Sequence, residues 1–136
     1  MTGYSGTPLP AKLGIKPGAR VALVNPPPGS RDVLGELPEG VALVQAGDGA
    51  LDVVVCFVAG AEGLADRFLE LKRQLQPAGG LWIAWPKRRK GMPVGIGENA
   101  IREVGLAAGL VDNKVCAIDE HWSGLRFVFR REDRRK

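Results

Sequence analysis

The chain has 136 residues, of which 45% are hydrophobic and 25% are charged, and it carries a net charge of +4. This length predicts a single domain over residues 1–136, and the composition excludes both a disordered chain and a membrane-spanning one. Residues 1–6 have neither the basic start nor the apolar run of a secretion signal. We therefore expect a cytoplasmic protein rather than a secreted one.

Positive charge is concentrated in two segments of the chain. Residues 87–90 contribute +4 and residues 130–136 contribute +3, which leaves the rest of the chain at −3. Basic segments of this kind are typical of solvated loops and tails, and also of surfaces that bind phosphate-rich partners. The solvated interpretation is favoured, and an auxiliary nucleic-acid binder is an alternative. Its candidate residues are Lys87, Arg88, Arg89 and Lys90.

Hydrophobic runs, helical periodicity and turn residues predict an ordered series of elements between an extended lead-in (1–10) and a basic tail (131–136). Strands are expected at residues 20–25, 41–44, 51–58, 81–85, 114–119 and 125–130, and helices at 11–15, 31–37, 62–76 and 98–108. Ser30 is expected to cap the second helix, and residues 77–80 to form a turn after the third.

Two of these strands indicate the kind of sheet. Residues 51–58 are apolar on both faces, which is typical of a parallel strand covered by helices on both sides. The last two strands are separated only by residues 120–124, so we expect an antiparallel hairpin with its final strand near the sheet edge. The expected fold is a Rossmann-like α/β sheet, mostly parallel, with a C-terminal antiparallel hairpin and helices on both faces.

The order of these elements resembles the class I S-adenosylmethionine-dependent methyltransferase fold, shortened near its start. Residues 16–24 (KPGARVALV) look like that family's lead into its first strand. Residues 51–55 (LDVVV) look like its fourth strand, and residues 75–81 (LQPAGGL) are similar to the turn before its fifth. The resemblance implies the fold, with the family's cofactor binding as a further expectation.

At a finer level, residues 85–87, 111–120 and 122–126 resemble a small bacterial family of unknown function. This resemblance covers nearly the whole chain. It implies the same fold and a bacterial origin, but no activity and no catalytic residue.

The sequence departs from the methyltransferase pattern where the cofactor would bind. That pattern uses a glycine-rich turn after the first strand and an acidic residue at the end of the second. Here the first strand is followed by Asn25 and the three prolines 26–28, and the second ends at Val44 and Gln45. We therefore expect no cofactor, and we keep a methyltransferase that binds S-adenosylmethionine at an atypical site as an alternative. Residues 25–27 (Asn-Pro-Pro) resemble the start of an amino-methyltransferase motif, but Pro28 stands where that motif has an aromatic residue.

Ligands of open α/β sheets bind beyond the carboxyl ends of the strands, so these ends form the candidate cleft. The amide, cation and flat indole found there suit an anionic or aromatic ligand. The candidate residues are Asn25, Pro26, Gly29, Gly60, Trp85 and Lys87. The resulting hypothesis is a non-enzymatic binding or scaffold protein with an unknown small ligand or protein partner. The alternative for Trp82 and Trp85 is that they only fill the core.

The remaining reactive residue types indicate no catalytic or metal site. His121, the single histidine, lies in the predicted hairpin loop beside Asp119, where a surface position is favoured over a catalytic relay. Cys56 and Cys116 lie within apolar strands, which predicts free thiols that behave as small hydrophobes.

Overall fold

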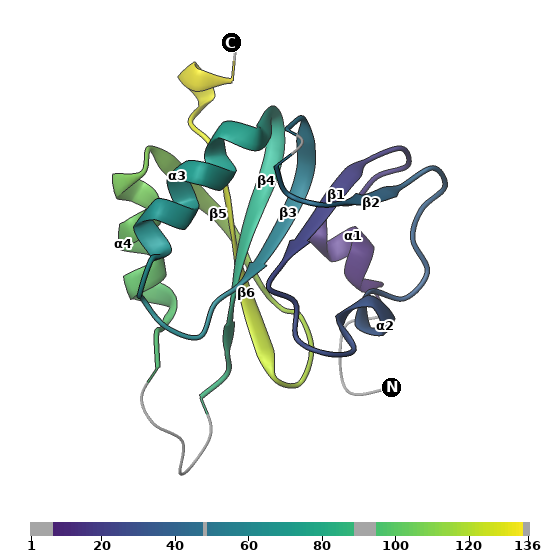
Figure 1. The fold of residues 1–136 in the computed structure, drawn as a ribbon, viewed down its shortest axis with the longest axis horizontal. Helices are drawn as coiled ribbons and strands as arrows, with labels where there is room; N and C mark the ends of the chain where they lie inside the picture. The colour runs from purple at the N-terminus through teal and green to yellow at the C-terminus, as the bar shows by residue number, and fades with distance from the viewer. Residues whose placement is uncertain (1–6, 48, 89–94, 135–136) are drawn as a thin grey trace.

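The computed structural model describes residues 7–47, 49–88 and 95–134. These residues form a six-stranded sheet in the order β2-β1-β3-β4-β6-β5 (Figure 1). The strands are β1 (Arg20–Val24), β2 (Ala42–Val44), β3 (Leu51–Phe57), β4 (Leu75–Pro86), β5 (Leu110–Ala117) and β6 (Trp122–Phe129). The helices are α1 (Leu9–Leu13), α2 (Ser30–Leu34), α3 (Leu64–Gln74), α4 (Glu98–Ala107) and the 3-10 turn η1 (Arg131–Asp133).

The sheet is mostly parallel, as predicted. β1 pairs in parallel with both β2 and β3, and β3 pairs in parallel with β4. β6 is antiparallel to both β4 and β5. The predicted hairpin is thus confirmed, but β6 lies one strand in from the edge and β5 is the edge strand.

Helices cover both faces of the sheet, with α3 and α4 on one side and α1 and α2 on the other (Figure 1). The alternation along β3 explains why its sequence is apolar throughout. Val54 and Cys56 belong to the core under α3 and α4, whereas Val55 and Phe57 belong to the core under α1 and α2. The prediction of a strand buried on both faces is confirmed.

The α4 helix packs closely on β6 because one of its residues has no side chain. Gly105 is buried against the ring of Phe127, and that ring meets Phe68 of α3 edge-to-face at 4.9 Å between centroids. On the other face, the indole N–H of Trp82 donates a 3.0 Å hydrogen bond to the carbonyl of Leu13 at the end of α1. Together these contacts fix a helix layer to each side of the sheet.

Several predicted boundaries are wrong, each for a local reason. α1 begins at Leu9, inside the predicted lead-in, because proline is tolerated in a first helical turn. Ser30 is the first residue of α2 rather than its cap, and its hydroxyl donates to the Pro27 carbonyl at 2.6 Å. Residues 75–80 are strand, not helix end and turn, because Leu75 already pairs with Leu51.

No helix in the part of the chain that the structure describes is long and apolar enough to span a membrane.

Candidate functional site

A topological switch point lies between β1 and β3. The chain leaves β1 to form β2 on one side and then returns to form β3 on the other, so the connections after β1 and β3 diverge. A pocket of about 680 Å³ opens where they diverge. We call it the strand-end pocket. Its lining residues are Asn25, Phe57, Val58, Ala59, Gly60, Glu62, Gly63, Leu64 and Arg67.

Two residues with left-handed backbone conformation shape this pocket. Asn25 follows β1 with φ 53°, a conformation that asparagine tolerates better than most residues. Gly63 has φ 72° and directly precedes α3, where its carbonyl accepts a 3.0 Å hydrogen bond from the amide of Arg67. The chain can therefore turn sharply after β1 and before α3, which leaves the space between them open.

The lining combines an apolar wall with polar groups at the rim. Phe57 and Leu64 are buried and form part of the apolar lining. Asn25 is exposed and offers an amide, while Arg67 offers a guanidinium. Arg67 pairs with Glu70 at 3.3 Å, and both side chains are substantially exposed, so this pair is weak and its guanidinium can be shared with a ligand.

The structure brings together two of the six residues predicted for the cleft, Asn25 and Gly60. Pro26 and Gly29 are exposed beside the pocket but are not among its lining residues, so the three prolines leave it open. Trp85 is only 8% exposed and packs in the core under α3 and α4, where alternation along β4 directs it. It therefore does not form a wall of the pocket.

Lys87 and Arg88, the described residues of the basic loop, are not among the lining residues of the strand-end pocket. Lys87 donates its backbone N–H to the carbonyl of His121 at 2.8 Å, which ties the end of β4 to the hairpin. Arg88 is exposed. Arg89 and Lys90, the other members of the alternative nucleic-acid site, lie outside the described residues.

Sequence reasoning missed the two charged residues of the pocket, Glu62 and Arg67. Both lie within the helix predicted at residues 62–76, and neither is a candidate site residue of the sequence analysis. A usable signal was present, because the start of the helix that follows β3 must lie at the carboxyl edge of the sheet. A side chain in its first turn is therefore close to any ligand bound at that edge.

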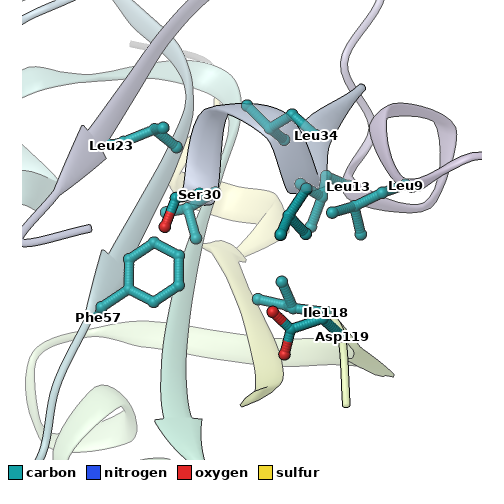
Figure 2. A pocket seen from close by; sticks show the side chains of 10 residues that line it. Leu9, Leu13, Leu23, Ser30, Leu34, Phe57, Ile118 and Asp119 are labelled. Atoms are coloured by element: carbon teal, nitrogen blue, oxygen red, sulfur yellow. The ribbon is translucent and has the colours of Figure 1, made fainter. Parts of the chain in front are cut away.

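A second, much smaller pocket lies between α1, α2 and the sheet (Figure 2). Its side chains are mostly apolar, and its volume of about 10 Å³ is at most that of one water. The two polar groups at its wall are already bonded. Ser30 donates to Pro27, and Asp119 accepts from the amides of His121 and Trp122 at 2.7 and 2.9 Å. This pocket is a packing gap rather than a ligand site.

The two cysteines and the histidine lie where the sequence analysis places them. Cys56 and Cys116 are free thiols, Cys56 is buried, and burial raises its pKa to about 11. His121 is exposed, and the carboxylate of Asp119 is engaged by backbone amides of the same turn. No cluster of three or more metal-ligating side chains occurs among the residues that the structure describes.

Solved structures with the same fold define the class. A SAM-dependent methyltransferase from Aquifex aeolicus matches with a TM-score of 0.57 at 14% identity, over 86% of this chain and 85% of that one. A putative type 11 methyltransferase from Sulfolobus solfataricus matches with a TM-score of 0.57 at 16% identity, over 90% and 89%. A chain from the complex between the Haloferax volcanii Trm112 methyltransferase activator and the putative methyltransferase matches with a TM-score of 0.64 at 12% identity, over 88% and 86%. The fold is therefore methyltransferase-like and Rossmann-like, as predicted.

The sequence itself places the chain in a family. Residues 32–131 match the family described as "Protein of unknown function (DUF3052)", and the chain belongs to that family. No curated relative matches the sequence.

The residues around the pocket depart from the pattern by which this fold usually holds S-adenosylmethionine. Prolines 26–28 follow β1 and have no N–H groups to donate where a glycine-rich turn would offer them. The described lining of the pocket contains residues that follow β1 and β3 but none from β2, which would hold the ribose.

Proposed function

We propose that this protein is a non-enzymatic small-molecule-binding protein that uses the strand-end pocket. One observation carries the proposal, namely an open pocket of about 680 Å³ at the topological switch point. This volume is within the range of about 300–1,000 Å³ that is usual for small-molecule sites. The position is also the one at which open α/β sheets bind ligands.

The chemistry of the lining suggests the class of ligand. Phe57 and Leu64 present an apolar surface, and Asn25 and Arg67 place an amide and a cation at its rim. Such a set suits a ligand with an apolar or planar body and one anionic group, because a guanidinium binds carboxylates and phosphates through paired N–H donors. Glu62 gives the rim a negative charge as well, so a zwitterionic ligand also fits the lining.

The lining offers more for binding than for proton chemistry. Among the residues that the structure describes, it contains one carboxylate, Glu62, and no histidine, cysteine, lysine, serine or tyrosine. Methyl transfer, which needs positioning more than proton chemistry, is the alternative that the position of the pocket favours. In that case S-adenosylmethionine would have to be held without the glycine turn and without a residue from β2.

A pocket-filling variant tests the proposal. A side chain at Gly60 would enter open space, since a Cβ there has no neighbour within 4 Å, so Gly60→Leu should fold and obstruct the pocket. Ala46→Leu adds the same side chain at an exposed loop position and is the control. Both are compared with wild type in amide NMR titrations against a panel of nucleosides, amino acids, carboxylic acids, S-adenosylmethionine and S-adenosylhomocysteine.

The expected result is saturable shifts at Asn25 and at residues 57–67 with at least one non-cofactor compound. These shifts should be lost in Gly60→Leu and kept in Ala46→Leu. Shifts elsewhere, or shifts that survive in Gly60→Leu, contradict binding in the strand-end pocket. Saturable shifts with S-adenosylmethionine alone would support the methyltransferase alternative instead.

A further inference from the structure

A different pocket lies at the other end of the strands from the strand-end pocket, where β4 begins and β6 ends. In Figure 1 this end of the strands is at the top, near η1. From there β4 runs down toward the end at which the strand-end pocket lies. The pocket has a volume of about 160 Å³, and we call it the arginine pocket. Its lining residues are Pro77, Ala78, Gly79, Asn113, Arg126, Val128 and Arg134.

The guanidinium of Arg126 lies close to Gly80 of β4. A Cβ added to Gly80 would be 2.8 Å from Nη2 and 2.9 Å from Cζ of Arg126, and closer still to Nε. Gly80 is therefore the residue that allows this close approach. It pairs with Val53 in the sheet, so its position is fixed by the ladder and not by a turn.

Arg126 is held there without a matching acceptor. Its Nε is buried and has no hydrogen-bond partner within the described part of the chain. Buried guanidinium N–H groups are normally paired, because leaving such a donor unsatisfied is unfavourable. Because Arg126 also lines the pocket, its guanidinium is available to an acceptor from outside the chain.

The two charged residues in the described lining of the pocket are both arginines. Arg134 lines the pocket together with Arg126, and its own Nε donates to the carbonyl of Phe129 at 3.0 Å. Lys114 is the cross-strand partner of Arg126, and its ammonium donates to the carbonyl of Lys12. No carboxylate is among the lining residues that the structure describes. Burial lowers the pKa of Arg126 below its ordinary value, and the charge of Arg134 lowers it further.

We propose that the arginine pocket is an anion-binding site for a phosphate-type oxyanion, held between the guanidinium groups of Arg126 and Arg134 with the amide of Asn113 beside them. A volume of about 160 Å³ has room for one phosphoryl group. Planar guanidinium groups bind such oxygens through two parallel N–H bonds. This site is separate from the strand-end pocket, so its test does not depend on the proposed function.

Inorganic phosphate is the probe, added to the full chain at constant ionic strength with chloride as the reference anion. Binding is followed by isothermal titration calorimetry and by amide NMR shifts at residues 77–79, 113 and 126–128. The variants are Arg126→Gln and Arg134→Gln. Arg130→Gln is the matched control, because it removes the same charge four residues from each of them without being part of the lining.

The expected result is a saturable site in wild type whose affinity falls about tenfold or more in both pocket variants. Arg130→Gln should bind phosphate like wild type. Because Arg134 is exposed on the last turn, Arg134→Gln should fold normally and keeps the test valid even if Arg126→Gln is unstable.

Gly80→Ala provides an independent test that keeps every charge. The added methyl group would clash with the Arg126 guanidinium and displace it. Made in the wild-type protein, Gly80→Ala should therefore lower phosphate affinity about tenfold. Made in the Arg126→Gln variant, it should cause no further loss. Equal affinity in all variants, no saturation, or binding of a single-stranded oligonucleotide without binding of phosphate would each overturn the proposal.

Discussion

Gly105 of α4 provides a test of how the helix layer packs on the sheet, because replacing it with alanine has two opposing effects. Alanine is favoured over glycine inside a helix by about 1 kcal/mol. The added Cβ, however, would be 2.7 Å from Cδ2 and Cζ of Phe127 and closer still to Cε2. The ring cannot retreat, since it is fully buried and packs edge-to-face on Phe68.

Overpacking of this kind costs about 1–3 kcal/mol, and the present contacts favour the upper value. We therefore expect Gly105→Ala to lower the free energy of unfolding by about 2 kcal/mol after the gain in helix propensity is included. Urea unfolding followed by tryptophan fluorescence measures this change. Gly60→Ala, whose Cβ meets no atom within 4 Å, is the control and should stay within about 0.5 kcal/mol of wild type.

A second substitution separates the clash from other effects. Phe127→Leu removes the ring atoms that the new methyl group would meet, so it should cost less stability in the Gly105→Ala background than in wild type. A Gly105→Ala variant at least as stable as wild type would refute the packing described for α4 and β6.

Three further predictions concern the strand end, the buried thiol and the buried indole. Asn25→Gly should keep or slightly raise stability, and Asn25→Val should lower it by about 1–2 kcal/mol in the same urea assay, because φ is 53° there. Burial raises the pKa of Cys56 from 9.0 to about 11, so the unfolded chain ionises first as pH rises. Between pH 9 and 11 wild type should lose about 2 kcal/mol more than Cys56→Ala; parallel curves would contradict this. Trp82→Phe should cost about 2–4 kcal/mol in thermal unfolding, because it leaves the Leu13 carbonyl without its donor; a cost below about 1 kcal/mol would contradict the bond.

The fold could be predicted because its signals are local. The apolar run of β3, the periodicity of α3 and the short hairpin connection each depend on neighbouring residues, and their order implies the sheet. The error at residues 75–80 arose because proline and glycine commonly form turns. Here Gly80 lies within a strand, where its missing side chain accommodates Arg126 from β6. That contact joins residues far apart in sequence, and no local pattern reports it.

The candidate site could be predicted only in part for the same reason. The rule that ligands bind at carboxyl strand ends is sufficient to find Asn25 and Gly60. It cannot decide which way Trp85 points, because a strand buried on both faces shows no alternation of polar and apolar residues. Trp85 belongs to the same core as Ile83 and Leu81, two and four residues earlier in β4.

The most direct test of the central claim is the titration of wild-type protein with S-adenosylhomocysteine by isothermal titration calorimetry. The claim is that the fold is methyltransferase-like while the strand-end pocket lacks the groups that hold this nucleoside. It predicts no saturable heat, because prolines 26–28 offer no N–H donors and the described pocket lining includes no residue from β2. A saturable isotherm that disappears in Gly60→Leu would contradict it.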